Sequence, residues 1–313
     1  MREAAEARAQ AVKEQALALG FDACGIARAG PADPQDELGA WLAQGYHADM
    51  DWLARTKSLR QDVLRHVPGA QSVVVTARNY YYPRPDACDG AGKVSRYAWG
   101  RDYHRVIRKL LKRLAAFIDG LDPEARSVVS VDSGPVLEGW WAVQAGVGWV
   151  GKNSLILRED LGSWFFLGVV ITTVPLAADS PVPERCGSCS ACIQACPAGA
   201  IVRPGTVDAR RCIAYHTIEN RGDIPEELHP CMGLWVFGCD LCQEVCPWNR
   251  SPVQTSEEQF QPRPGVANPD LAELGGMDAA AFERRFQGSA VRRARHSGIR
   301  RNACIALRNL ADT

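Results

Sequence analysis

The sequence predicts an α+β fold that is followed by a cysteine-rich segment and a short helical tail. Three observations indicate this organisation. Helical and strand-like patterns alternate over residues 1–177, nine of the twelve cysteines lie between Cys186 and Cys246, and the residues after 269 carry a helical, arginine-rich pattern. Proline-rich stretches at 175–183 and 251–269 separate these parts. We therefore expect three units, over residues 1–177, 178–255 and 256–313.

The first unit is predicted to combine helices with buried strands. Charged residues and Ala or Leu recur at helical spacing near the start, and residues 101–118 form an amphipathic pattern with a basic face. We predict helices over 3–19, 37–44, 50–55, 101–118 and 136–145, and strands over 22–27, 72–76, 128–131, 154–158 and 164–172. The strand over 164–172 belongs to the longest apolar run, which is too short for a membrane helix.

Asp132 follows the third predicted strand and precedes Ser133-Gly134-Pro135, and two roles are open for it. The pattern alone favours a helix cap for residues 136–145. Alternatively, a carboxyl in an apolar cavity would have a raised pKa and could donate a proton. The following segment, Gly146–Asn153, lacks the spacing of a phosphate-binding loop, and we expect its glycines to let the backbone approach a large planar ligand.

The second unit carries two cysteine runs that predict iron–sulfur clusters. The first run is C-x2-C-x2-C-x3-C-P from Cys186 to Pro197, and the second is C-D-L-C-Q-E-V-C-P from Cys239 to Pro247. In ferredoxins with this spacing, three thiolates hold one 4Fe–4S cluster and the fourth crosses to a second cluster. Zinc sites use separated cysteine pairs, and disulfide frameworks are typical of short secreted domains, so both alternatives are disfavoured.

The crossing pattern assigns seven of the eight ligands. Cluster one is expected to use Cys186, Cys189, Cys192 and Cys246. Cluster two is expected to use Cys196, Cys239 and Cys242, with either Cys212 or Cys231 as its fourth ligand.

The charge of the chain restricts its partners. Lys plus Arg equal Asp plus Glu at 36 each, which excludes a generally basic surface for nucleic-acid binding.

Many cysteines without a secretory signal predict a cytoplasmic location and no membrane contact. Between Arg284 and Ala311, however, there are eight arginines and no acidic residue. This run is either a solvated helix face or a contact to RNA phosphates through Arg292, Arg293, Arg300 and Arg301.

Taken together, several segments resemble the epoxyqueuosine reductase family, which reduces a modified nucleoside of tRNA. The matching segments are R-Y-A-W-G-R-D-Y-H (96–104), V-D-S-G-P-V-L-E (131–138), G-V-G-W-V-G-K-N (146–153), the cysteine runs, I-P-E-E-L (224–228) and G-C-D-L-C-Q-E-V-C-P-W-N (238–249). The resemblance covers nearly the whole chain. It implies a cobalamin-binding domain related to reductive dehalogenases, then a ferredoxin-like domain with two clusters, then a short helical (HEAT-like) tail.

The resemblance also implies roles for individual residues. Asp132 matches the proton donor of the family, Cys212 matches the fourth ligand of cluster two, and Cys231 is expected to be a buried thiol. The positions that match cobalamin contacts are Arg60, Ser95, Asp132, Ile156, Leu157, Arg158, Leu167, Cys239 and Asp240.

The implied reaction is the two-electron deoxygenation of epoxyqueuosine, at the anticodon wobble position of tRNA, to queuosine. Electrons from a low-potential donor are expected to pass through two 4Fe–4S clusters to base-off cobalamin, since the nearest D-x-H-x-x-G candidate at Asp102 lacks its glycine. Two other functions are possible on sequence grounds. One is a reductive dehalogenase-like enzyme that acts on a small molecule, and the other is an electron-transfer ferredoxin fused to a structural domain.

Overall fold

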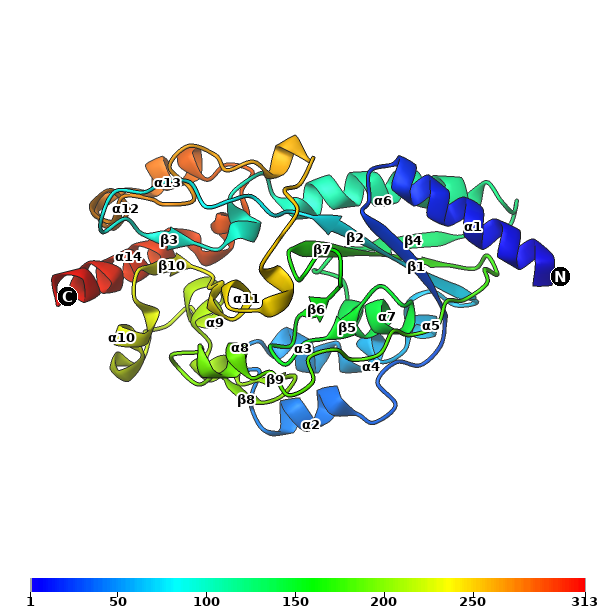
Figure 1. Cartoon of the computed structure of the whole chain (residues 1–313), viewed down its shortest axis with the longest axis horizontal. Coiled ribbons are helices and arrows are strands. Elements are labelled where there is room, and N and C mark those ends of the chain that lie inside the picture. Colours follow the sequence, from blue (N-terminus) through cyan, green and yellow to red (C-terminus); the bar gives the residue numbers. More distant parts are fainter. Residues whose placement is uncertain (1, 313) are drawn as a thin grey trace.

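The computed structural model describes residues 2–312, and its first part is an antiparallel sheet with helices on both faces (Figure 1). The four strands lie in the order β1 (Ala23–Arg28), β2 (Ser72–Asn79), β7 (Phe165–Thr172) and β4 (Ser127–Ser130). Strands β2 and β7 pair along their whole length, from Ser72 opposite Thr172 to Asn79 opposite Phe165.

Strand β2 explains why the apolar pattern is nearly continuous rather than alternating. All eight of its residues are buried because helices cover both faces. On one face, Val74 packs under α1 (Arg2–Ala18) and α6 (Tyr103–Asp119). On the other face, Val73 and Val75 pack under α7 (Glu138–Gln144). Burying each such side chain stabilises the fold by about 1.5–3 kcal/mol.

Short elements surround the α7 face of the sheet. They are α2 (Glu37–Ala43), α3 (Asp51–Arg55), α4 (Lys57–Arg60), α5 (Val63–His66) and the two-stranded ribbon of β5 (Trp149–Val150) and β6 (Ile156–Leu157). The cysteine-rich part lies beside this face (Figure 1). It contains α8 (Ala191–Gln194), β8 (Ile201–Arg203), β9 (Thr206–Val207), α9 (Ile213–Ile218), α10 (His229–Met232), β10 (Trp235–Phe237) and α11 (Leu241–Glu244).

The tail packs against the cysteine-rich part and against the segment of the first part around Val94 and Trp99. It consists of α12 (Leu271–Gly276), α13 (Ala279–Arg285) and α14 (Arg295–Ala311), and strand β3 (Lys93–Val94) pairs in parallel with β10. Trp99, Phe237 and Phe282 are fully buried in one cluster that draws residues from all three predicted units. Single 3-10 turns complete the chain: η1 (Arg96–Ala98), η2 (Ala209–Arg211), η3 (Glu226–Leu228), η4 (Pro247–Asn249), η5 (Glu258–Phe260) and η6 (Ala290–Ala294).

The four tail arginines that the sequence suggests as RNA contacts each have a partner within the chain. Arg292 pairs with Glu283 at 2.5 Å, and Arg293 pairs with Glu219 at 2.7 Å. Arg300 donates to the Gly275 carbonyl at 3.0 Å. Arg301 donates to the carbonyls of His216 (2.6 Å) and Asn220 (3.1 Å), so it joins α14 to the loop after α9. Arg301 therefore has a structural role, and the RNA contacts expected for the tail arginines stay a prediction.

No helix within residues 2–312 is both long enough and apolar enough to cross a membrane.

Candidate active site and cysteine cavities

The eight cysteines of the two predicted clusters line two separate cavities. Cys186, Cys189, Cys192 and Cys246 surround a cavity of about 230 Å³, which we call the cluster-one cavity. Cys196, Cys212, Cys239 and Cys242 line one part of a larger cavity of about 580 Å³, which we call the inner cavity. The two sets are those that the crossing pattern predicts, with Cys212 as the eighth member.

Local structure explains how residues that are distant in the sequence meet here. Helix α8 contains Cys192 and helix α11 contains Cys242, and the two helices pack against each other, which brings the two cysteine runs together. Cys212 directly precedes α9, where 3-10 turn η2 ends. Cys231 does not line the described inner cavity; it lies on α10, half-buried rather than buried, and its thiol donates to the Pro197 carbonyl at 3.5 Å.

The donor sets fit 4Fe–4S clusters better than single metal ions. Among residues 2–312, no three His, Cys, Asp or Glu side chains are close enough together to hold one ion. A cubane spreads its four cysteine sulfurs around a larger body, and each cavity offers four thiols. No carboxylate or histidine is among the described lining of the cluster-one cavity, and Asp132 and Glu138 are the carboxylates among that of the inner cavity. The amide of Ala200 also points at the Cys196 sulfur (3.2 Å), as cluster ligands require.

The segment 146–153 supports the cluster-one cavity from the side of the first unit. Lys152 donates to the carbonyls of Gly187 (2.5 Å) and Cys189 (2.8 Å). The expectation that Gly148 admits a planar ligand is wrong, because an added Cβ would lie 2.2 Å from the Leu157 carbonyl oxygen. That glycine lets β5 pack closely on β6, and of the glycines in this segment only Gly151 lines a described cavity.

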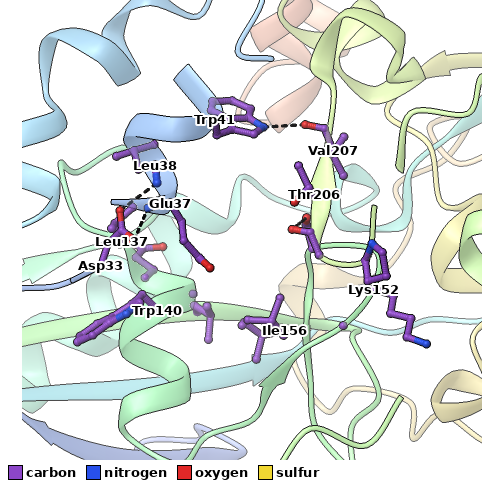
Figure 2. Close-up of a pocket in the computed structure, with 18 of the residues that line it drawn as sticks. Asp33, Glu37, Leu38, Trp41, Leu137, Trp140, Lys152, Ile156, Thr206 and Val207 are labelled. Carbon is purple, nitrogen blue, oxygen red and sulfur yellow. Dashed lines mark hydrogen bonds between the residues drawn. The ribbon is translucent and has the colours of Figure 1, made fainter. Parts of the chain in front are cut away.

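A third cavity, of about 1000 Å³, meets the inner cavity at Asp132. This outer cavity lies between α2, the start of α7 and the β8–β9 hairpin (Figure 2). Across its rim, the Trp41 indole donates to the Val207 carbonyl at 2.7 Å. Six residues line both cavities: Asp132, Glu138, Ser154, Ile156, Leu167 and Val207. Asp132 therefore faces one large composite space whose far wall carries the cluster-two cysteines.

The backbone at Asp132 is unusual and does not form a helix cap. Its φ is +54°, a left-handed conformation that non-glycine residues rarely adopt and that is frequent at functional sites. The N-cap residue of α7 is Leu137, without a side-chain cap hydrogen bond, so the cap that the pattern favoured is wrong. The Asp132 carboxylate instead accepts a hydrogen bond from the Tyr103 hydroxyl at 2.6 Å. Its side chain is 65% exposed and can meet a substrate.

His104 lies between the carboxylates of Asp132 and Asp102. Its Nε2 lies 3.4 Å from Asp132 Oδ2, and its Nδ1 lies 2.8 Å from Asp102 Oδ1. Although burial opposes charging, the neighbouring Asp102 and Asp132 carboxylates raise the pKa of His104 to about 9. The nearby His104 ring in turn lowers the pKa of Asp132. The alternative that an apolar cavity raises the pKa of Asp132 is thus wrong, because the effect of His104 outweighs that of burial.

Glu138 holds the Asp132 loop in place. One carboxylate oxygen accepts from the Asp132 amide (2.7 Å) and from the Ser130 hydroxyl (3.1 Å). Burial, together with the nearby Asp132 carboxylate, raises the pKa of Glu138 to about 7. The loop between β4 and α7 is therefore closed on itself by a single side chain.

The residues expected at cobalamin are distributed unequally. Ile156 and Leu167 line both cavities, Arg60 lines the outer cavity, and Ser95 and Cys239 line the inner cavity. Leu157 lines the cluster-one cavity instead. Neither Arg158 nor Asp240 is part of the described lining. Arg158 pairs with Asp160 at 2.6 Å, and Asp240 is fully buried, where it accepts hydrogen bonds from the Ser95 hydroxyl and the Arg96 amide.

Three functional candidates are not predicted by the sequence analysis: Tyr103, His104 and Glu138. The first two lie in the segment R-Y-A-W-G-R-D-Y-H, where the sequence offers His104 only as a possible cobalt ligand. Glu138 ends the segment V-D-S-G-P-V-L-E. Their membership of these two segments was the available signal, and the contact between the segments was not visible in the sequence.

Comparisons with known proteins agree with this architecture. A family model described as "4Fe-4S double cluster binding domain" matches residues 185–249, and one described as "Epoxyqueuosine reductase QueG, DUF1730" matches residues 60–133. A solved reductive dehalogenase shares the fold, with a TM-score of 0.53 at 19% identity over 95% of this chain and 38% of that chain.

Closer similarity is found to epoxyqueuosine reductases. A solved member, in complex with an epoxyqueuosine-modified tRNA stem loop, is 31% identical with a TM-score of 0.89 over 97% of this chain and 82% of that chain. The Epoxyqueuosine reductase of Gloeobacter violaceus is 44% identical over 309 residues, which are 96% of each chain. This chain therefore belongs to the epoxyqueuosine reductase family.

Proposed function

We propose that the chain reduces epoxyqueuosine in tRNA to queuosine. The observation that carries this proposal is the position of Asp132, whose carboxylate faces a composite cavity with four cluster-type cysteines on its far wall. The solved relative binds a tRNA stem loop that carries this nucleoside. An exposed carboxylate at the junction of two cavities can reach an oxygen atom of a nucleoside that enters from the surface.

Cobalamin fits the composite cavity. The inner cavity offers the aromatic and aliphatic walls that a flat macrocycle needs, including Phe165, Ile156 and Leu167. Arg60 and Ser95 would hold its polar edges, and Cys239, a ligand of cluster two, would lie beside it. No histidine lines the described inner or outer cavity, which agrees with a cofactor bound without a protein-derived lower ligand. When bound, cobalamin supplies the reducing equivalent that opens the carbon–oxygen bond.

The cavities also suggest an order for the two clusters. Cys196, Cys212, Cys239 and Cys242 share a cavity with Asp132, whereas the other four cysteines line a cavity of their own. We therefore place cluster two, with the former set, next to the cofactor. Cluster one, held by Cys186, Cys189, Cys192 and Cys246, receives electrons from a low-potential donor.

The RNA is expected to approach over a group of arginines near Asp132. Arg293 acts electrostatically on Asp132, and both Arg293 and Arg295 act on Arg221. Arg295 is exposed, and no ion pair or hydrogen bond of its side chain is described. Phosphate contacts of this kind position an RNA and are weakened by salt. A cytoplasmic location, where tRNA is available, follows from this substrate.

We also propose the three units expected from the sequence: residues 1–177 as the cofactor-binding catalytic part, residues 178–255 as the part that holds the clusters, and residues 256–313 as the helical tail. Because all three contribute to the cluster around Trp99 and Phe237, we expect them to unfold together rather than one by one.

The test uses the full chain with both clusters reconstituted under anaerobic conditions. Incubation with cobalamin, a low-potential reductant and a stem loop that contains epoxyqueuosine is expected to remove one oxygen atom from the nucleoside, as measured by mass spectrometry. Protein that carries eight irons and bound corrinoid but leaves the nucleoside unchanged would overturn the proposed function.

A further inference from the structure

The stoichiometry of the proposed reaction requires more protons than Asp132 can store. Removing an epoxide oxygen as water breaks two carbon–oxygen bonds, forms one carbon–carbon double bond, and consumes two electrons and two protons. The two electrons arrive through the clusters. One carboxyl group can hold only one proton, and at neutral pH the cationic neighbour of Asp132 keeps even that proton off, because it lowers the pKa of the carboxyl.

The geometry points to His104 as the residue that holds the proton. His104 connects Asp102 to Asp132, with 2.8 Å from Asp102 Oδ1 to Nδ1 and 3.4 Å from Nε2 to Asp132 Oδ2. Asp102 is itself fixed, because it caps α6 by accepting from the His104 amide at 3.0 Å. The His104 ring is further held by stacking on Tyr103, with 4.1 Å between ring centroids.

We propose that His104 is the proton source of the site and that Asp132 is the group that hands each proton to the substrate oxygen. This inference rests on the proposed function. In the first delivery, the His104 Nε2–H bond breaks, a proton passes through Asp132 Oδ2, and an O–H bond forms on the oxygen that leaves its first carbon. His104 then takes a proton from water, which its 30% exposed side chain allows. A second delivery along the same path releases that oxygen as water.

The other groups around these three residues favour the same assignment. Tyr103 donates to Asp132 and stays neutral, because burial raises its pKa far above the physiological range. Arg108 reaches the Ser133 hydroxyl at 3.4 Å, and Arg105 and Arg293 act on Asp102 and Asp132 respectively. Glu138 binds the Asp132 amide rather than its carboxylate. Both Tyr103 and His104 contact the carboxylate, but of the two only His104 can release a proton near neutral pH.

The pH profile distinguishes a proton source from a structural histidine. In the wild type, single-turnover rates are expected to hold up to about pH 9 and to fall above it, as His104 loses its proton. Asp102→Asn keeps the helix cap but removes an anion that raises the pKa of His104, so this fall should move to lower pH. His104→Gln should lower the single-turnover rate on the order of tenfold or more at pH 8. The decrease should be smaller at pH 5, where Asp132 can take a proton from solvent.

Chemical rescue supplies a second readout. His104→Ala opens a space for free imidazole, which should restore turnover in the wild-type pH range. His296→Gln is the matched control, since its ring bonds the Met277 carbonyl in the tail, and its profile should be unchanged. Each variant is compared at equal iron and corrinoid content.

Two results would overturn the inference: a His104→Gln enzyme with the wild-type rate and profile, or a loss that is equal at every pH and is not rescued by imidazole. A wild-type enzyme that is inactive on epoxyqueuosine would instead refute the proposed function, so the two failures are distinguishable.

Discussion

Asp132 depends on its neighbours for both its shape and its charge, and this makes Asp132→Asn an informative change. Asn tolerates the left-handed conformation that φ = +54° imposes, so the loop should keep its geometry. The variant cannot carry a proton to the substrate. We expect folding, iron content and corrinoid binding to survive while turnover falls on the order of a hundredfold or more. Full activity, measured by nucleoside mass, would remove Asp132 from the proton path.

Glu138 should make the stability of the fold depend on pH. Its pKa in the folded chain is about 7, above the unfolded value of about 4.5, so ionisation is disfavoured by folding. Its stabilising contribution is therefore complete below about pH 4.5 and is lost as the pH rises through 7. In the wild type, the free energy of unfolding should fall by about 1–3 kcal/mol between pH 5 and 8 for this reason. Glu138→Gln keeps an acceptor for Asp132 and Ser130 and should remove this fall.

Chemical denaturation at both pH values measures the effect of Glu138→Gln. The exposed Glu124→Gln, which removes the same charge elsewhere, is the control. An unfolding free energy that falls equally in all three proteins would contradict the assignment.

The two candidate cysteines for cluster two differ in a way that iron analysis can detect. Cys212 lines the inner cavity, whereas Cys231 bonds the Pro197 carbonyl outside it. Cys212→Ala should therefore lose about half of the eight irons, and Cys231→Ala should keep them all. The reverse pattern of loading would exchange the two residues in the assignment.

At the scale of elements, the sequence predicts well those helices and strands that have a long amphipathic or apolar pattern. The helix over 101–118 appears as α6, and the buried strand over 164–172 appears as β7, because a long amphipathic or apolar run has few alternatives. Short pieces such as α10, β3 and β10 were missed, since a pair such as β3 and β10 is formed by contacts between residues about 140 positions apart.

The same limit applies to the site. Cysteine spacing is a local property and predicts the donor sets. The helix cap at Asp132 and the role of Gly148 were misjudged, because each depends on a neighbour from another segment: His104 for the former and Leu157 for the latter.

The β5–β6 ribbon leads to a prediction at this scale. Lys152 crosses from the first unit and donates to two carbonyls of the cluster-one loop. Lys152→Met keeps an aliphatic stem but loses both hydrogen bonds and the positive charge. We expect cluster one to bleach faster in air than in the wild type, while cluster two is unaffected, as followed by electron paramagnetic resonance of the reduced protein. Lys93→Met, at the β3 strand, is the control.

At the scale of the whole molecule, helix α14 organises the tail. Arg301 and Asn302 use their donors on carbonyls of α9, its following loop and β10, so this helix face is committed to holding the tail on the cluster-bearing part. Arginine density alone therefore did not distinguish structural arginines from arginines available to a partner. The exposed Arg295 and Arg308 are available to a partner, and they lie at opposite ends of α14, about 20 Å apart along its axis.

This separation permits a matched test of the RNA path. If RNA approaches Asp132 over Arg221, Arg293 and Arg295, then Arg295→Gln should weaken binding of a tRNA stem loop. It should also reduce the slope of log affinity against log salt by about one unit, since one phosphate contact is lost. Arg308→Gln removes the same charge at the far end of α14 and should leave affinity for the short stem loop unchanged. Fluorescence anisotropy across a salt series measures both variants. If the slopes are equal in the wild type and in Arg295→Gln, Arg295 does not contact RNA and belongs to a solvated helix face. The basic face of α6 would then be the next candidate for the RNA path.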